Sequence, residues 1–599
     1  MTTRPGDSVT MARRLAMLAA ALLLVGFHLG LIFSGMAPNL VARPLHLALI
    51  LPWVFIFSDP RGRLADAMGG VIAIAGIAAA IWIALNADRL SDQYGFVETG
   101  FQYGVGAVLL LSVLESARRA IGWPLPLIAL LALAYAAFGQ HVPGEFGHAP
   151  LPWPSLMGTL TLAEGGIFGS LTGVSVGVVA IFVIFGAVLN TGEAGQGFMN
   201  LAATAAGRLR GGAGKVSVIA SALFGSISGS ASANVASTGA VTIPAMVRLG
   251  YPRRIAGAVE AVASSGGQIM PPLRGAGAFV MVELTGTPYT QIIAAALLPA
   301  ILYFVVVWFG IDAYARRFGL GALPVDQRPS ARDTAITSGF FAVPFAVLLG
   351  GMFAIGYTPQ YAAALAILAG AALLFFGADM RLDLRRAATR FETALLTAAR
   401  QVALIGSIIL CASIIVGVLA ITGLGVKITS LILSASNGQL WPSLILTALA
   451  CLILGMEVPT TAAYVICISV AGPALTSLGL EPLQAHLFVF WFALLSTITP
   501  PVCGAVFIAA GMAQENWVKV AVTAMALGVG LYLIPLGMVA WPDLLRLSED
   551  TPRALIAGAV VGGGCIVISY ALILLRSPLK SVLGVALGMG LIFLPPLLL

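Results

Sequence analysis

Charged residues are scarce in this chain. Asp, Glu, Lys and Arg make up 9% of its 599 residues, whereas hydrophobic residues make up 59%. Soluble domains carry about 25% charged residues, and the mean hydropathy of +1.01 also lies far from the soluble average. This composition excludes a soluble globular protein. Long apolar runs instead predict an all-α polytopic membrane protein, whose backbone hydrogen bonds are satisfied within helices.

Cysteine and histidine are also rare. The five cysteines all lie inside apolar runs and show no CxxC or other metal spacing, so neither a disulfide framework nor a structural metal site is expected. The five histidines form no spaced cluster either. Neither an organic cofactor nor a metal held by cysteine or histidine is therefore expected. The net charge of +7 would fit a nucleic-acid partner, but the distribution of the basic residues described below argues against one.

The apolar run Leu15–Met36 is long, and another run follows closely, so we interpret it as an uncleaved first span rather than a signal peptide. Residues 1–120 hold four spans. The remaining spans are expected in the middle and C-terminal parts. All expected spans after the first are Leu45–Ser58, Ala67–Asn86, Gly100–Leu114, Trp123–Gln140, Thr172–Leu189, Arg254–Leu284 (broken at Pro271), Ile292–Ile311, Gly339–Gly356, Tyr361–Gly377, Val402–Thr422, Leu487–Met512 (broken at Pro500), Val520–Val539, Leu555–Leu575 and Val582–Leu599.

Basic residues are distributed unevenly over this threading. With the N-terminus in the cytoplasm, five of the 31 Lys and Arg residues fall outside, namely Arg43, Arg89, Lys427, Arg546 and Arg553. Arg274 falls within the membrane, and all others are cytoplasmic, as the positive-inside rule requires. The segment Arg381–Arg400 has arginines on one side and Leu or Ala on the other, which favours an interfacial helix that lies flat on the membrane.

One stretch among the apolar segments is a poor lipid-facing helix. Gly225–Pro244 reads GSISGSASANVASTGAVTIP, and its continuation Ser264–Ala276 reads SSGGQIMPPLRGA. Small residues, hydroxyls, one Asn and a Pro-Pro pair interrupt both. Backbone at membrane depth is irregular only where protein or a water-filled cavity satisfies it. The alternate serines in 225–232 suggest an extended segment with one wall turned toward a site.

A second copy appears when the sequence is shifted by 229 residues. Pro244 then falls on Pro473, the pair Pro271-Pro272 on Pro500-Pro501, and Gly275 on Gly504, without a gap. Repeat 1 covers about 216–285 and repeat 2 about 441–512. Two broken, hydroxyl-rich segments at matching positions indicate the binding site of a transporter. Basic loops surround only the first copy and five expected spans separate the two, so we predict inverted re-entrant hairpins that enter from opposite membrane faces.

These motifs resemble a known family. GSISGSASANVASTGAVTIPAM, EAVASSGGQIMPP, GMEVPTTAAYVI and STITPPVCGAVFIAAGMA are similar to the large membrane subunit of tripartite ATP-independent periplasmic (TRAP) transporters, fused to its four-helix small subunit. The resemblance implies that 1–120 is small-subunit-like scaffold and 122–545 large-subunit-like; residues 553–599 add two spans without an assigned role. It further implies a permease of the bacterial inner membrane that takes up an organic acid with sodium. A soluble periplasmic binding protein would deliver the acid, and a transport domain would move like an elevator.

The residues are compatible with sodium, a hard cation that prefers several neutral oxygens from hydroxyls and freed carbonyls. Not all candidates can be ligands, and for a single serine, packing between helices is about as likely as ligation. The candidate set is Ser226, Ser228, Ser230, Asn234, Gly266 and Gly267 in repeat 1 and Thr460, Thr461, Thr497 and Thr499 in repeat 2.

The substrate anion needs a different set of groups, for which Arg274, Ser232, Pro272 and Pro501 are the candidates. Arg274 would be costly in the membrane unless paired or wet, and its guanidinium suits a carboxylate. Its alternative partner is Glu457, which forms an internal ion pair or carries a proton. Glu260 and Glu283 are expected near helix ends, in structural roles.

Three other classes compete with this interpretation. A membrane hydrolase needs a nucleophile beside a base, and GSISG is out of register for G-x-S-x-G with no histidine near it. A channel would use one continuous pore and has no need of two inverted hairpins. A sodium- or proton-coupled anion symporter that works without a binding protein is the strongest alternative, although it would not need the four-span module in 1–120.

Overall fold

The computed structural model describes residues 11–35, 37–271, 275–455, 460–501, 503–575 and 577–598, without the side chains of Ser226, Ser228, Gly275, Ala276 and 595–598. Helices account for most of these ranges, and the β pairing within them is an isolated bridge between Phe376 and Leu382. Eleven of the described helices are long and apolar enough to cross a membrane. The predicted fold class, an all-α polytopic membrane protein, is therefore confirmed.

The chain folds into two compact units. The first contains the residues up to Gly192 together with Val343–Thr422, and the second contains Glu193–Ala342 and Gly423–Leu599. Helix α16 (Ala331–Leu349) contains the border at residue 343. The elements of the first unit are α1 (Met11–Ser34), α2 (Asn39–Phe55), α3 (Arg63–Leu85), α4 (Ala87–Asp92), α5 (Gly100–Ile121), α6 (Pro124–Phe138), η1 (Gly139–His141), η2 (Gly144–Phe146), α7 (Trp153–Thr161), α8 (Ser170–Val174), η3 (Ser175–Val179), α9 (Ala180–Thr191), η5 (Gly350–Ile355), α17 (Pro359–Leu373) and α18 (Leu384–Thr422).

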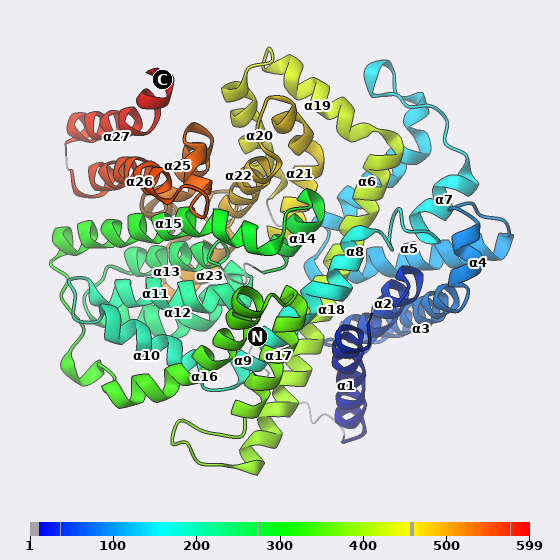
Figure 1. Cartoon of the computed structure of the whole chain (residues 1–599), viewed down its shortest axis with the longest axis horizontal. Coiled ribbons are helices and arrows are strands. Elements are labelled where there is room, and N and C mark those ends of the chain that lie inside the picture. Colours follow the sequence, from blue (N-terminus) through cyan, green and yellow to red (C-terminus); the bar gives the residue numbers. More distant parts are fainter. Residues whose placement is uncertain are drawn as a thin grey trace. The chain divides into compact units, whose positions relative to one another are not determined.

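Helix α18 is the centre of the first unit. Its 39 residues pack against α1, α2, α5, α6 and α9, and α3 packs on α2 and α5 (Figure 1). The prediction of a separate flat helix at Arg381–Arg400 is wrong. No Gly or Pro interrupts the chain between Leu384 and Gly406, so the amphipathic turns continue directly into the apolar span. Near its start, Glu392 forms an ion pair with Arg14 of α1.

Two histidines that are far apart in sequence meet inside the first unit. His28 of α1 and His46 of α2 are both fully buried, and their ring nitrogens Nε2 and Nδ1 lie 2.8 Å apart. His28 Nδ1 donates to the Leu24 carbonyl at 2.8 Å, and Ser175 Oγ lies 3.1 Å from His46 Nε2. If the Ser175 hydroxyl donates to His46 Nε2, all four ring nitrogens of the two histidines have a hydrogen-bond partner while both rings are neutral. The pair thus joins α1, α2 and the π-helical turn η3.

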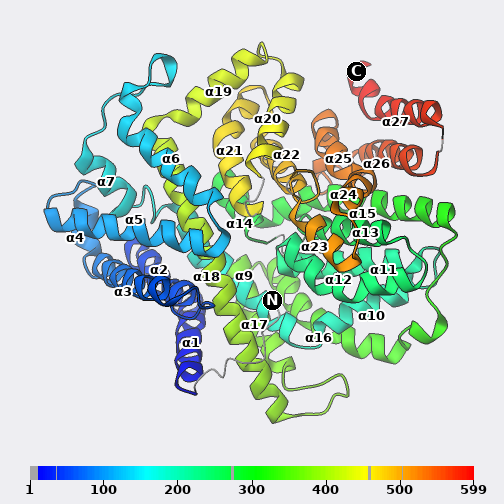
Figure 2. The same ribbon diagram turned by 180° about the vertical axis from the view of Figure 1, so that it is seen from behind.

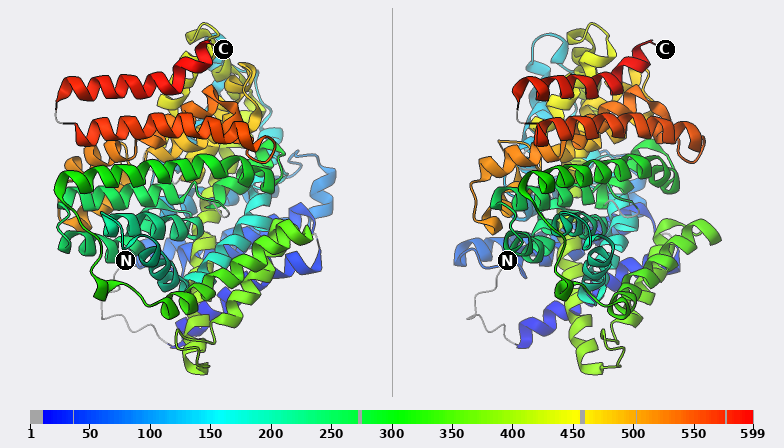
Figure 3. Two further views of the ribbon diagram at one scale, coloured as in Figure 1. Left: turned by 60° about the vertical axis from the view of Figure 1, so that its left-hand side comes forward. Right: turned by 90° about the vertical axis from the view of Figure 1, so that its left-hand side faces the viewer.

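The second unit contains the two interrupted segments. Its elements are α10 (Ala194–Ala206), α11 (Gly212–Ser228), α12 (Ala231–Arg248), α13 (Arg253–Gly267), α14 (Gly275–Thr285), α15 (Tyr289–Phe318), η4 (Val325–Gln327), α19 (Leu424–Ala435), α20 (Leu440–Leu454), α21 (Thr460–Ser477), α22 (Pro482–Leu495), α23 (Gly504–Ala513), α24 (Trp517–Leu527), α25 (Val529–Ala540), η6 (Pro542–Leu545), α26 (Thr551–Leu574) and α27 (Pro578–Leu598). The two C-terminal helices belong to this unit: α26 packs along α15, and α27 packs along α26 (Figure 3).

The helix bounds repeat with the offset seen in the sequence. Adding 229 to the bounds of α12 gives 460 and 477, which are the bounds of α21. The same shift places α13 on α22 and α14 on α23 to within one residue at each end. Pro244 and Pro473 both lie inside the second helix of their copy. The sequence repeat is therefore a repeat of helices and of breaks between them.

Candidate functional site

Helices α11 and α12 form a hairpin. They pack against each other and are joined by only two residues, Gly229 and Ser230. Gly229 has a φ of +61°, in the left-handed region that favours glycine, and ends α11. Ser230 then caps α12, because its hydroxyl accepts a hydrogen bond from the Ala233 N–H at 3.3 Å. Gly229 thus ends one helix of the hairpin, and Ser230 begins the next.

The predicted extended segment at 225–232 is wrong. The backbone from Gly225 to Ser228 completes the last turn of α11, and Ala231 already begins α12. Alternate serines do not force a strand where consecutive amide groups can bond within a helix. The irregular backbone is therefore limited to the turn at Gly229 and Ser230.

The base of this hairpin is fixed by Tyr251, in the loop between α12 and α13. Its hydroxyl donates to the Gly211 carbonyl at 2.8 Å and accepts from the Gly214 N–H at 3.2 Å. Burial raises the pKa of Tyr251 to about 12, so the phenol keeps the proton that it donates. The base of the hairpin is thus held independently of its tip.

Helix α13 ends beside the hairpin tip and is followed by a break. At its end the chain tightens into a turn in which Ile269 N–H bonds to the Gly266 carbonyl at 3.1 Å. A Cβ on Gly267 would lie 2.7 Å from the Cα of Gly225 and 2.9 Å from Asn234 Nδ2. The two glycines therefore allow α11 and α13 to meet backbone to backbone. Asn234 locks this contact, donating to the Ser221 carbonyl at 2.9 Å and the Ser264 carbonyl at 3.4 Å.

The second repeat has the same arrangement with different residues. Helices α20 and α21 pack against each other and α22 lies beside them (Figure 2). Helix α22 ends at Leu495, and Thr497 N–H bonds to the Leu494 carbonyl at 3.0 Å in a tight turn before α23. A Cβ on Gly455, after the end of α20, would lie 3.1 Å from Ser496 Oγ. In both copies, the end of the first hairpin helix (α11 or α20) thus meets the break that follows the third helix (α13 or α22).

Gln268 connects the two repeats. From the break after α13, its Nε2 donates to the carbonyl of Gly229 at 3.0 Å, at the tip of the first hairpin. Its Oε1 accepts from the hydroxyl of Thr460 at 2.9 Å, at the start of α21. One amide therefore contacts both hairpins. Its importance was not predicted, although glutamine is the natural residue to satisfy a donor and an acceptor together.

Two further contacts join the copies. The hydroxyls of Ser265 and Thr497, each at the end of its broken helix, lie 2.9 Å apart. A Cβ on Gly504, the first residue of α23, would lie 3.4 Å from Ser232 Oγ of α12. Hairpin tips and helix breaks of both repeats thus converge within the second unit, and α12, α21 and α23 all begin there.

The remaining predicted sodium- and substrate-binding residues make different contacts. Thr497 also donates to the Leu494 carbonyl at 2.8 Å, and Thr499 Oγ1 lies 2.7 Å from the hydroxyl of Tyr532 on α25. Thr461 lies in the first turn of α21, and Pro501 is exposed in the turn before α23. Some predicted groups fall outside the described residues: Pro272, Arg274, Glu457 and the side chains of Ser226 and Ser228.

Sequence reasoning also misplaced one carboxylate. Glu260 lies in the middle of α13 and is fully buried, not near a helix end. Glu283 is exposed and close to the end of α14, as expected. Spacing could have revealed the Glu260 environment, because pairs four residues apart share a helix face. Such pairs are Ser217 with Ser221, Thr238 with Thr242, and Glu260 with Ser264.

The described residues hold no group of three or more His, Cys, Asp or Glu placed to bind a metal ion. A nucleophile beside a base is also missing from the described part of the cluster, whose polar groups are hydroxyls, amides and backbone carbonyls. Neutral oxygen groups at paired helix breaks in an apolar, many-helix chain define a membrane transporter of the broken-helix class.

The family follows from comparison with known proteins. Residues 108–548 match the family model described as "Tripartite ATP-independent periplasmic transporter, DctM component". The match covers well over half of the chain, and the chain belongs to this family. It is therefore a transporter permease, a multi-pass membrane protein and not an enzyme.

Relatives share the large-subunit region and, in one case, the fusion. The chain is 28% identical over 357 residues to the "C4-dicarboxylate TRAP transporter large permease protein DctM" of Pseudomonas aeruginosa, covering 58% of this chain and 78% of the relative. It is 25% identical over 510 residues to the "Isethionate TRAP transporter permease protein DctMQ" of Oleidesulfovibrio alaskensis, covering 82% and 74%. The "Sialic acid TRAP transporter large permease protein SiaM" of Vibrio cholerae is 21% identical over 391 residues, covering 65% and 90%. The long match to the fused permease fits a fusion of small and large subunits here.

Proposed function

We propose that this permease couples the inward movement of sodium to the uptake of an organic acid anion delivered by a periplasmic binding protein. The observation that carries the proposal is Gln268, whose amide contacts Gly229 of one hairpin and Thr460 of the other. A site built from both repeats can be exposed to either side of a membrane in turn when the repeats are inverted. Family membership supports secondary transport of an organic acid with a binding protein.

Sodium would bind where neutral oxygens gather at the hairpin tips. Asn234 uses its Nδ2 on two backbone carbonyls, so its Oδ1 remains an acceptor with a long contact of 3.4 Å from Thr238. Gly267 keeps the backbone beside Asn234 free of a side chain, whereas a Cβ on Gly266 would meet the ring of Tyr303. We assign the first sodium to this region with Ser226, Ser228 and Ser230, and a second to Thr460, Thr461, Thr497 and Thr499. Neutral ligands fit a singly charged ion that must also leave.

The acid would bind beside these cations. Helices α12, α21 and α23 begin at the cluster, and helix N-termini carry partial positive charge that favours anions. Ser232, which lies beside Gly504 at the start of α23, is the described candidate for a carboxylate contact. Pro501 and the residues Pro272 and Arg274 complete the proposed set, with Arg274 binding the acid or pairing with Glu457.

The alternating motion would be of the elevator type. One compact unit holds both hairpins and both breaks, which suits a transport domain that moves as a body. Counting the 12-residue α19 as too short to cross a membrane, five helical passes lie between the hairpins, namely α13 with α14, α15, α16 with η5, α17 and α18. An odd number favours inverted copies. The charge distribution further favours a cytoplasmic N-terminus in the bacterial inner membrane.

Uptake into proteoliposomes tests the proposal. The full chain is reconstituted and offered a labelled C4-dicarboxylate, keto acid or sugar acid with its binding protein. A tenfold inward sodium gradient releases about 1.4 kcal/mol per ion, so coupling to one ion should accumulate the acid about tenfold. A potassium gradient of the same size is the control and should give no accumulation.

The alternative functions give different results in the same assay. Sodium-driven uptake that persists without the binding protein would identify a simple symporter. Uptake that ignores sodium and collapses with a protonophore would replace sodium by protons and would contradict the proposed coupling. Equilibration without accumulation under any gradient would identify a channel and would overturn the proposal as a whole.

A further inference from the structure

A carboxylate is enclosed by hydroxyl groups next to the hairpin. Glu260 of α13 has an exposed fraction of 0%. Its two oxygens contact five hydroxyls from three helices, which is more donors than the four lone-pair positions of a carboxylate. Oε1 accepts from Ser221 at 3.3 Å, Ser264 at 3.1 Å and Thr238, and Oε2 accepts from Ser217 at 2.7 Å and Thr242.

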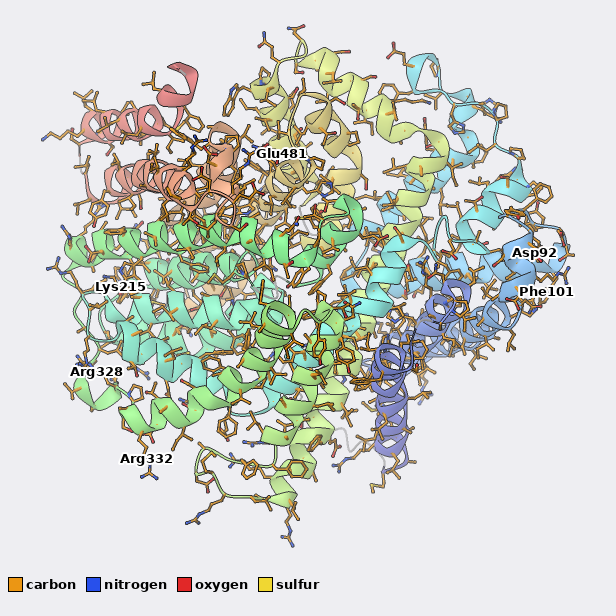
Figure 4. All side chains as sticks on the ribbon, viewed as in Figure 1. Asp92, Phe101, Lys215, Arg328, Arg332 and Glu481 are labelled. Atoms are coloured by element: carbon orange, nitrogen blue, oxygen red, sulfur yellow. The ribbon has the colours of Figure 1, made fainter. Side chains whose placement is uncertain are left out.

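The charge of this carboxylate has no basic partner among the described residues, since no described Lys, Arg or His nitrogen lies within 4.0 Å of it. The titratable groups on α13 and on the helices that pack against it either have other hydrogen-bond or ion-pair partners or do not contact Glu260. Lys215, labelled in Figure 4, pairs with Asp312 at 3.3 Å, and Tyr303 donates to the Val262 carbonyl at 2.8 Å. The others are Arg248 on α12, Arg253 and Arg254 on α13, Tyr289, Tyr314, Arg316 and Arg317 on α15, and Lys519 on α24.

A buried ion without a counter-ion is expensive, and hydroxyl dipoles offset only part of the cost. Such a group is normally neutralised by a cation or a proton. The packing favours the proton, because the hydroxyls touch the carboxylate oxygens directly. A sodium ion at these oxygens would have to displace them, whereas a proton needs no space.

The hydrogen bonds accommodate both charge states. The hydroxyl of Thr242 lies 3.0 Å from the Thr238 carbonyl as well as against Glu260 Oε2. The hydroxyl of Thr238 likewise has the Asn234 carbonyl at 2.8 Å as a second acceptor beside Glu260 Oε1. Each threonine has one hydrogen, so each bonds either to the carboxylate or to its own backbone.

The second repeat shows that the fold does not need these groups. Shifting their positions by 229 residues gives an apolar counterpart for each polar side chain. The counterparts of Ser217, Ser221, Thr238, Thr242, Glu260 and Ser264 are Leu446, Ala450, Cys467, Ala471, Val489 and Ala493. Helices in the same order, and equal in length to within two residues, form around either set. A buried carboxylate retained in only one copy points to a role other than folding.

We propose that Glu260 binds and releases a proton as part of the transport cycle, in addition to the sodium sites proposed above. On proton uptake a hydronium ion gives up a proton and leaves as water, and the new O–H bond at Oε2 donates to Thr242 Oγ1. The Thr242 hydrogen then turns from Oε2 to the Thr238 carbonyl, and no other atom gains or loses a proton. The heavy atoms stay in place.

The network also connects this proton to the sodium candidates. The Thr238 hydroxyl lies between Glu260 and Asn234, and Ser264 bonds Glu260 through its hydroxyl while its carbonyl accepts from Asn234. A change of charge at Glu260 therefore redirects the Thr242 hydroxyl onto the Thr238 carbonyl, one helical turn from Asn234. The inference rests on the proposed cation-coupled function, since it assigns one more coupling ion to the same unit.

Infrared difference spectra of the purified full chain, titrated from about pH 4 to about pH 9, test this directly without substrate or binding protein. A buried protonated carboxyl band should appear as the pH falls and should be absent in Glu260→Gln. The matched control Glu283→Gln removes an exposed glutamate near a helix end and should keep the band. Because the assay measures no uptake, failed sodium coupling would leave its outcome unchanged.

Removing a hydroxyl donor provides a second variant that keeps the carboxylate. Thr242→Val removes a partner that stabilises the ionised form, so the pH at which the band disappears should rise by about one unit. The proposal is overturned if the titrating band is the same in Glu260→Gln, if no buried carboxyl titrates in the range, or if Thr242→Val leaves the midpoint unchanged. Loss of the band on adding sodium chloride at constant pH would instead assign a sodium ion to these oxygens. That result would overturn the proposal that Glu260 binds a proton.

Discussion

Gly267→Ala should reduce uptake at least about tenfold and destabilise the second unit. A Cβ at this position would lie 2.7 Å from both the Cα of Gly225 and the carbonyl oxygen of Ser221, and 2.9 Å from Asn234 Nδ2. Two of these atoms are backbone, so α11 and α13 would have to separate. Overpacking of this kind costs about 1–3 kcal/mol. We therefore expect a lower thermal unfolding temperature and a loss of uptake of at least about tenfold, since about 1.4 kcal/mol is a factor of ten.

A glycine-to-alanine substitution elsewhere in the same helix is the control. Gly257→Ala, also in α13, would place its Cβ 3.2 Å from a methyl group of Val520, which can give way. It should leave both unfolding and uptake close to those of the parent. Equal behaviour of Gly257→Ala and Gly267→Ala would show that the backbone contact between α11 and α13 does not matter for transport.

Gln268→Leu should reduce uptake strongly while leaving the fold intact. The substitution removes the bonds to the Gly229 carbonyl and the Thr460 hydroxyl without adding volume. An unpaired acceptor costs about 1–3 kcal/mol when fully buried, and Gly229 and Thr460 are half-buried, so uptake should fall by up to about tenfold if the cycle needs the two hairpins joined. Thr460→Val removes only one of the bonds and should have a smaller effect.

A double-mutant cycle separates this link from two independent effects. The double variant Gln268→Leu with Thr460→Val should transport no worse than Gln268→Leu alone, because the second change then removes nothing further. Gln196→Leu, an exposed glutamine of the same unit, is the control and should keep full uptake. Strict additivity of the two losses would mean that Gln268 and Thr460 act separately.

The repeat and its helix breaks are the part that sequence alone predicts best. A gap-free offset of 229 depends only on residue identities, and proline and glycine mark breaks because of their own backbone chemistry. The bounds of α12 and α21 therefore agree with the offset residue for residue. The apolar runs are equally informative, since a membrane span demands length and hydropathy and little else.

The exact starts and ends of two helices were not predicted correctly. The serines of 225–232 have a strand-like alternation, yet local helical hydrogen bonds and the Gly229 turn decide the backbone. The arginine-rich face of α18 is typical of an interfacial helix, but helix continuation is favoured where neither glycine nor proline intervenes. Periodicity cannot separate these cases, because it does not report where a helix ends.

Contacts between residues that are far apart in the sequence could not be predicted from it either. His28 and His46 belong to no sequence pattern and meet only because α1 and α2 pack inside one unit. Glu260 looks like an isolated acid until α11, α12 and α13 bring their hydroxyls around it. Gln268 gains its role from two hairpin tips that no local rule places together. A site shared by several helices is thus predicted as a region, while its key side chains come from the packing.

The claim that the two repeats build one site is tested most directly by a cross-link between them. Ser232 on α12 and Gly504 on α23 are close enough for a disulfide or mercury bridge after mutation to cysteine, since Ser232 Oγ lies 3.4 Å from a Cβ on Gly504. In a Cys503→Ala background, the pair Ser232→Cys and Gly504→Cys should form a bridge visible by mass spectrometry of the linked peptides, and the bridge should block uptake reversibly. Pairing Ser232→Cys with Gly511→Cys, further along α23, should give no bridge. Absence of the bridge at Gly504, or a bridge of equal yield at Gly511, would contradict a shared site.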